Sequence, residues 1–133
     1  MLLVDTSVWS LAFRRDQPPD DPRVEHLRRA LLRAADVALT GLILQELLQG
    51  VRGPKQRDML IERLDSLPLV EPDRRDHVAA AEVRNTCRRR GVQLGTVDAL
   101  IAALCIRHEL TLLTADADFD HAARIIPLHV WEP

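Results

Sequence analysis

Short apolar runs alternate with longer stretches of helical periodicity along this chain. The run at residues 2–4 ends at a carboxylate, which is typical of a central strand buried on both faces. Because strands separated by helices require crossover connections, the pattern predicts an α/β/α sandwich with a central, mostly parallel sheet. Further strands are expected at 37–40 and 111–114, a small strand or connector at 69–70, and a last strand at 125–131 that Pro127 interrupts.

Amphipathic or apolar stretches between these strands predict seven helices. Their apolar residues recur three and four positions apart, and glycine or proline follows several of them. Thr6 or Ser7 is expected to cap the first helix and Thr96 the sixth, because a hydroxyl can accept a free backbone N–H. The predicted helices cover residues 6–13, 23–35, 41–51, 55–67, 73–90, 97–108 and 116–123.

Composition favours one globular domain spanning residues 1–133. The chain is 47% hydrophobic and 29% charged, which supplies enough apolar surface for one core and excludes global disorder. The longest apolar run, 99–106, is too short to cross a bilayer, and nothing resembles a signal peptide, so we expect a cytoplasmic protein without a membrane partner. With a net charge of −2, any contact with nucleic acid must be local. Cys87 and Cys105 are expected to be reduced thiols packed in the core.

Four acidic residues fall where a parallel sheet would gather them at one edge. Asp5 follows the first strand, Glu46 lies in the helix after the second, Asp98 is in the first turn of an apolar helix, and Asp116 follows the strand at 111–114. Ligands of such sheets bind outside the carboxyl ends of the strands. Without a cation these carboxylates would repel one another and raise their pKa values, so a bound cation is expected.

The candidate ligands are all carboxylates. Oxygen ligands favour Mg²⁺, with Mn²⁺ as a substitute, over Zn²⁺, and such sites typically process phosphates. The residues therefore predict phosphodiester hydrolysis. Each carboxylate also has a structural interpretation, as a cap, a solvated helix face or a partner of the helix dipole. That interpretation is strongest for Asp118, which is either a further ligand or part of a turn.

Four segments resemble the PIN-domain nucleases, and especially the VapC-type toxins of bacterial toxin-antitoxin modules. They are residues 3–9 (LVDTSVW), the pair at 45–46 (QE), residues 96–103 (TVDALIAA) and residues 113–119 (LTADADF). The resemblance covers nearly the whole chain. Ala115 departs from it, because the family frequently has asparagine there, so we expect one hydrogen bond beside the site to be absent.

The resemblance implies a metal-dependent ribonuclease, commonly a homodimer, that a cognate antitoxin protein holds inactive. By motif match, Asp5, Glu46, Asp98 and Asp116 are the catalytic and metal-binding residues. Asp118 matches an auxiliary metal ligand or a carboxylate just behind the ligands. The implied substrate is RNA and the implied cofactor is Mg²⁺.

Two further features concern the partners. The helices at 23–35 and 55–67 carry apolar stripes that either pack on the sheet or on each other, or mark an interface. The resemblance favours a groove between these helices that receives an antitoxin segment. RNA approaching an acidic site also needs cations at its rim. The candidates are Arg14, Arg15, Arg52, Lys55 and the run Arg88, Arg89 and Arg90.

One alternative function stays open at this point. A PIN-like module could bind RNA or a protein without cutting, because intact acidic residues do not prove turnover. Other phosphate-handling folds lack their motifs: no GxGxxG or GxxxxGK[ST] loop is present, and Ser7 stands where an aspartyl-phosphate phosphatase needs a second aspartate.

Overall fold

The computed structural model describes residues 1–14, 20–33 and 36–133. Its sheet contains three parallel strands in the order β2-β1-β3. The central strand β1 is buried along its whole length, because elements on both faces cover it. The predicted central parallel sheet is therefore confirmed. The strands are β1 (Leu2–Val4), β2 (Val37–Ala38) and β3 (Thr111–Leu113).

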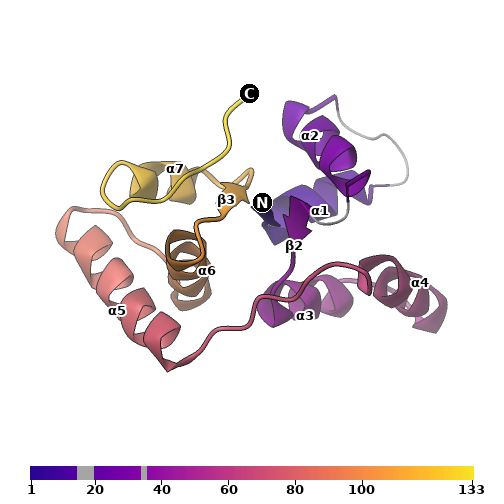
Figure 1. The fold of residues 1–133 in the computed structure, drawn as a ribbon, viewed down its shortest axis with the longest axis horizontal. Coiled ribbons are helices and arrows are strands. Elements are labelled where there is room, and N and C mark those ends of the chain that lie inside the picture. Colours follow the sequence, from indigo (N-terminus) through magenta and orange to yellow (C-terminus); the bar gives the residue numbers. More distant parts are fainter. Residues whose placement is uncertain (15–19, 34–35) are drawn as a thin grey trace.

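Seven helices of the described residues flank the sheet, as the hydrophobic pattern predicts. In Figure 1, α1 to α4 lie on the side of β2, and α5 to α7 lie on the side of β3. The predicted α/β/α sandwich is confirmed. The helices are α1 (Thr6–Ala12), α2 (Pro22–Leu31), α3 (Gly41–Gln49), α4 (Pro54–Leu64), α5 (Arg74–Arg89), α6 (Thr96–Arg107) and α7 (Ala117–Ala123).

Helix α6 is the most buried helix of the described structure. Every residue from Ala99 to Cys105 is buried, and α5 packs along it. Cys87 and Cys105 are both free and buried, as expected, and burial raises the pKa of the Cys105 thiol to about 12. Across the described ranges, no helix combines the length and the apolar character that a membrane span requires.

The C-terminal segment differs from the predicted strand at 125–131. It makes one isolated parallel bridge, between Val130 and Leu112, instead of a continuous strand. Two backbone hydrogen bonds of 2.8 Å hold it there, from the Leu112 N–H to His129 and from the Trp131 N–H to Leu112. Pro127 has no N–H to donate, so pairing cannot extend toward the start of the segment. Leu69 makes a similar single bridge to Leu39.

The capping predictions for two helices are wrong. Asp5 is the N-cap of α1 and Gly95 is the N-cap of α6, and neither contributes a side-chain hydrogen bond to its helix. Thr6 and Thr96 are instead the first helical residues. The Ser7 hydroxyl does not cap α1 because it donates to the Asp5 carboxylate.

The largest differences between predicted and observed helix bounds are at α2 and α4. Helix α2 begins at Pro22 and ends at Leu31, whereas the prediction extended to 35, and residues 34–35 lie outside the described structure. Proline suits the first helical position because it has no N–H to leave unpaired. Helix α4 begins at Pro54 for the same reason and ends at Leu64.

Candidate active site

Two of the predicted acidic residues meet where β1 and β3 end. Asp5 follows β1, and Asp116 follows β3 and caps α7 by accepting the Asp118 N–H at 2.9 Å. Asp5 Oδ2 accepts hydrogen bonds from the Ser7 hydroxyl at 2.7 Å and from the Thr114 hydroxyl at 3.0 Å. Within the described ranges no donor bonds to Oδ1, so the buried Asp5 carboxylate has one fixed oxygen and one free oxygen.

The same two hydroxyls join the chain segments that follow β1 and β3. The Thr114 hydroxyl accepts the Asp116 N–H at 3.0 Å, and the Ser7 hydroxyl accepts the Ala115 N–H at 3.0 Å. Thr114 is only 3% exposed, so its hydroxyl does not exchange these partners for solvent. The positions of Asp5 and Asp116 are thereby coupled through one small network.

Helix α6 places Asp98 beside this network. Asp98 is half-buried in the first turn of the helix. Burial raises the pKa of its carboxyl from 3.8 to about 6, and the negative charges of Asp5, Asp116, Glu46 and Asp118 act in the same direction. The structure therefore brings all five predicted acidic residues into one electrostatic centre, called here the acidic centre.

Helix α3 places Glu46 at the exposed rim of the acidic centre. Partial burial raises the pKa of Glu46, and the negative charge of Asp5 acts in the same direction. The Thr6 hydroxyl is buried and makes no hydrogen bond among the described residues. Glu46 thus interacts with the other carboxylates through space rather than through their hydrogen-bond network.

The acidic centre has no cation of its own in the described structure. None of its five carboxylates forms an ion pair with an arginine, lysine or histidine of the described residues. Nor are any three His, Cys, Asp or Glu side chains among these residues arranged closely enough to enclose a metal ion. The centre therefore fits a hard cation by its donor type and its unbalanced charge, while a preformed cage is absent.

A cavity of about 670 Å³ opens beside Glu46, between α1, α3 and α4. Phe13 and Leu60 give it an apolar lining, and Arg14 and Arg63 give it two cations. Arg14 is one of the predicted phosphate contacts. Arg63 was missed, because its position on α4 gives no sign that this helix lies next to Glu46.

The predicted groove between the helices at 23–35 and 55–67 is supported for the second helix alone, because α4 lines the cavity beside Glu46. Helix α2 packs on α1, and it supplies no residue to the cavity. Val24 and Leu27 of its apolar stripe are buried in the protein itself, so this stripe is largely a core element. Figure 1 shows α1 lying between α2 and α3, with α4 beyond α3.

Of the remaining predicted phosphate contacts, those that the structure describes lie outside the lining of the cavity beside Glu46. Arg88 and Arg89 donate to Asn85 and Thr86 of their own helix, as expected for a solvated helix end. Arg52 and Lys55 are exposed before and within the first turn of α4, and Arg90 is exposed after α5. Arg15 lies outside the described residues.

The sequence profile of the PIN domain matches residues 2–125, which is most of the chain. The chain belongs to the PIN-domain family. The VapC ribonuclease Mb1587 of Mycobacterium bovis is 36% identical to this PIN domain in an alignment over 130 residues that covers 96% of each chain. The resemblance to VapC-type proteins is therefore confirmed.

Solved structures extend the comparison to the fold. FitAcB from Neisseria gonorrhoeae is 27% identical to this PIN domain, with a TM-score of 0.77 over 100% of this chain and 98% of that one. A toxin-antitoxin complex from Klebsiella pneumoniae includes a chain that is 21% identical, with a TM-score of 0.63 and 90% coverage of both chains. The second likeness concerns the fold alone.

Proposed function

We propose that this PIN domain is a Mg²⁺-dependent endoribonuclease and the toxin of a toxin-antitoxin module. One observation carries the proposal: five carboxylates share a partly buried centre that has no protein cation among the described residues, and burial together with the other four carboxylates raises the pKa of Asp98 to about 6. Such a centre is unfavourable unless a cation from solution binds there. The family relationship to named ribonucleases supports RNA as the substrate.

The proposal gives each acidic residue a role. Asp5, Glu46, Asp98 and Asp116 would hold Mg²⁺, with Mn²⁺ as a substitute, and Asp118 would assist them. When bound, the ion would neutralise phosphate charge and lower the pKa of a water molecule, which is the chemistry that phosphodiester hydrolysis needs. PIN-domain nucleases of the VapC type generally depend on a divalent metal, which supports this assignment.

The protein's own hydroxyls prepare the acidic centre for this cation. Because Ser7 and Thr114 both bind Oδ2 of Asp5, they orient the carboxylate and leave Oδ1 available. Thr114 also holds the backbone of Asp116, so the segments after β1 and β3 keep a constant separation. Orientation by fixed hydrogen bonds lowers the reorganisation that binding requires.

The partners are proposed on the same grounds. The antitoxin would occupy the cavity beside Glu46, where apolar Phe13 and Leu60 accept apolar side chains and the acidic centre attracts a basic residue. Exposed Met59 lines the same cavity, so the antitoxin would also cover it. We further propose a homodimer that acts in the cytoplasm, as is typical of the family.

The decisive experiment incubates the purified protein with single-stranded RNA and follows cleavage in Mg²⁺, in Mn²⁺ and in EDTA. We expect cleavage with either metal, none in EDTA, and none with Asp5→Asn. Asp58→Asn is the matched control, because Asp58 is an exposed aspartate of α4 outside the acidic centre. Circular dichroism must report the same fold for each variant.

The alternative predicts a different outcome of this experiment. A non-cleaving module would bind the RNA, or a protein partner, and leave the RNA intact with both metals. Calorimetric titration with Mg²⁺ separates the two further, since loss of binding in Asp5→Asn is expected only if the carboxylate holds the ion.

A further inference from the structure

A second cavity, of about 660 Å³, opens next to Thr114. It is bounded by the start of α2, by α7 and by the chain at 128–133, and it shares no lining residue with the cavity beside Glu46. Small-molecule sites typically measure about 300–1,000 Å³, so one nucleotide fits this volume. None of the five carboxylates lines this cavity, but Thr114 does, and its hydroxyl bonds to Asp5 and to the Asp116 backbone, so one residue connects the cavity with the acidic centre.

An ordered aromatic side chain lines this cavity. Trp131 is partly buried and follows the bridge that aligns Val130 with Leu112, so it lies beside the end of β3. His26 of α2 stacks on the indole, with ring centroids 4.4 Å apart and an angle of 16° between the planes. Trp9, by contrast, is only 1% exposed and packs within the core. A partly exposed indole held by a stacked imidazole offers a preordered surface to a nucleobase.

Charged groups in the cavity define where a phosphate could bind. Arg23 is already paired with Asp21 at 3.4 Å, whereas Arg124 is exposed and makes no ion pair among the described residues. The lining also includes the carboxylates of Asp120 and Glu132. Both signs are therefore present here, unlike the acidic centre, and Arg124 is the guanidinium left for a phosphate.

We infer that this cavity is a nucleotide subsite of the substrate, in which Trp131 stacks on the base beside the cleaved bond and Arg124 binds its phosphate. The inference rests on the proposed ribonuclease function and adds where the RNA strand lies relative to the carboxylates. A mostly polar lining around a stacked aromatic pair suits an unpaired nucleotide better than an apolar peptide segment. Since every base has a face that stacks, this subsite selects single strands and not a sequence.

The test measures RNA affinity apart from cleavage. A fluorescein-labelled oligoribonucleotide of about ten nucleotides, within the range of single-strand site sizes, is titrated with the full-length protein in EDTA and read by anisotropy. We expect Trp131→Ala to raise the dissociation constant about tenfold or more, and Trp131→Phe, which keeps a stacking ring, to stay within about threefold of the wild type.

Two arginine variants test the phosphate contact. Arg124→Gln should weaken binding about threefold or more and reduce its salt dependence, because one fewer counterion is released. Arg28→Gln is the matched control, since Arg28 is an exposed arginine of α2 that lines neither cavity. Cleavage assays in Mg²⁺ should place the loss for Trp131→Ala mainly in KM, with kcat within about threefold, because the base is held in the ground state and the transition state alike.

Each outcome decides between the possibilities. If Trp131→Ala and Arg124→Gln bind and cleave RNA like the wild type, the subsite is wrong while the ribonuclease proposal stands. If the wild type neither binds nor cuts RNA, both proposals fail together. If Trp131→Ala binds RNA normally but loses affinity for the purified antitoxin, the cavity is a protein interface and the inference is overturned. Thermal melting of Trp131→Ala and His26→Gln shows whether loss of the stack unfolds the C-terminal segment instead.

Discussion

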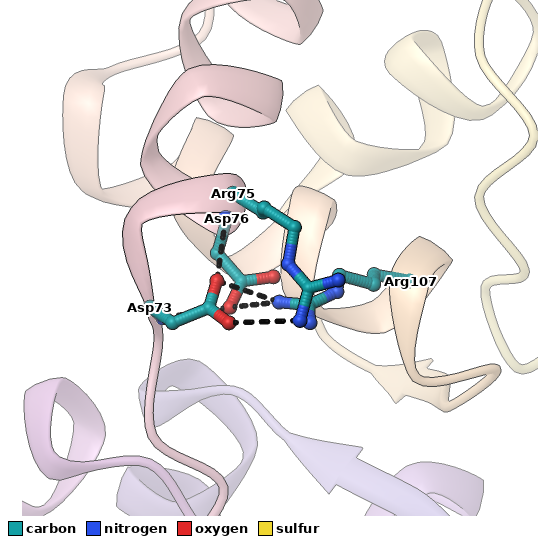
Figure 2. Close-up of polar contacts among 4 residues, drawn as sticks. All are labelled: Asp73, Arg75, Asp76 and Arg107. Carbon is teal, nitrogen blue, oxygen red and sulfur yellow. Dashed lines mark hydrogen bonds and ion pairs between the residues drawn. The ribbon is translucent and has the colours of Figure 1, made fainter.

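Two acidic clusters lie at opposite ends of α6 and behave in opposite ways. At the C-terminal end, Arg107 donates to Asp73 at 2.7 Å and to Asp76 at 2.8 Å, and Arg75 approaches Asp73 at 3.5 Å (Figure 2). The hydrogen bond from Arg107 lowers the pKa of Asp73 to about 2. At the N-terminal end, burial and four other carboxylates raise the pKa of Asp98 to about 6.

The two clusters differ in whether the folded protein supplies a cation, and this separates structural carboxylates from candidate catalytic ones. The Asp73–Asp76 cluster contains its own cation, and its aspartates also form the capping box of α5. The fold thus supplies a cation to both aspartates, although Oδ1 of Asp76 is buried without a hydrogen bond among the described residues, and the cluster ties the start of α5 to the end of α6. The acidic centre has comparable side chains but no cation among the described residues, so it is suited to a cation from solution.

The largest expected effect comes from removing a charge from the acidic centre. Asp98→Asn should reduce RNA cleavage by more than about 100-fold, because it removes a proposed metal ligand, and loss of groups merely supporting such ligands already costs about 10- to 100-fold. Single-turnover cleavage in Mg²⁺ measures this loss. Its fold should remain intact, since the substitution also relieves repulsion.

Asp118→Asn serves as the graded comparison for Asp98→Asn. Asp118 is exposed, and it touches Asp116 only through its backbone N–H, so a smaller loss of cleavage is expected. Near-wild-type turnover of Asp98→Asn would exclude Asp98 as a ligand and remove the contrast between the two clusters.

In the paired cluster the main effect should fall on stability. Asp76 is fully buried, accepts from Arg107 and caps the start of α5, so Asp76→Ala should lower the free energy of unfolding by about 3 kcal/mol. Urea denaturation measures it. Asp58→Ala is the control, because the Asp58–Arg57 pair is exposed at 3.0 Å and should contribute less than about 1 kcal/mol. Equal losses in the two variants would mean that burial does not strengthen the cluster.

A smaller effect should follow from removing one hydroxyl of the acidic centre. Thr114→Val keeps the shape of the side chain but removes the donor to Asp5 and the acceptor for the Asp116 N–H. We expect about a tenfold loss of cleavage and of Mg²⁺ affinity, as for other groups that orient metal ligands. Thr114→Ser retains the hydroxyl and should restore most of both, whereas a packing defect would affect the two variants alike.

The smallest effect is a difference in pH dependence between the clusters. The folded pKa of Asp98, about 6, exceeds its ordinary value of 3.8, so in metal-free buffer its contribution to stability is present below pH 3.8 and lost as pH rises to about 6. The pH dependence of Asp73 has the opposite direction. Its folded pKa, about 2, lies below the ordinary value of 3.8, so its contribution to stability is present above pH 3.8 and lost as pH falls toward 2.

Melting temperatures measured between about pH 2 and pH 7 test the opposite pH dependences of Asp98 and Asp73. Asp98→Asn should be more stable than the wild type above about pH 6 without metal, and the advantage should shrink with falling pH and with added Mg²⁺. A constant advantage at all pH values would show that Asp98 does not titrate in the folded protein as its surroundings indicate.

Four residues of the acidic centre could be predicted because they follow strands or lie in the first turn of a helix, whereas Glu46 lies inside α3 and was found through its motif. The apolar runs likewise predicted β1, β3 and buried α6 closely. Two predictions were wrong for local reasons. Pro127 cannot donate a backbone hydrogen bond, so the predicted last strand makes a single bridge, and the Ser7 hydroxyl donates to Asp5 instead of capping α1. Arg107 gave no sequence signal, since its aspartate partners lie 34 and 31 positions away.

The order of elements, the family and the five candidate carboxylates could all be inferred from the sequence, because hydrophobic periodicity and short motifs are properties of neighbouring residues. Only the tertiary structure decided which oxygen of Asp5 is fixed, which aspartates have a cation, and that Trp131 lines a cavity next to Thr114. Those facts depend on contacts such as the Asp5–Thr114 hydrogen bond, which spans 109 positions. Hydrogen bonds and ion pairs act over a few ångströms, so distances along the chain do not reveal them until it folds.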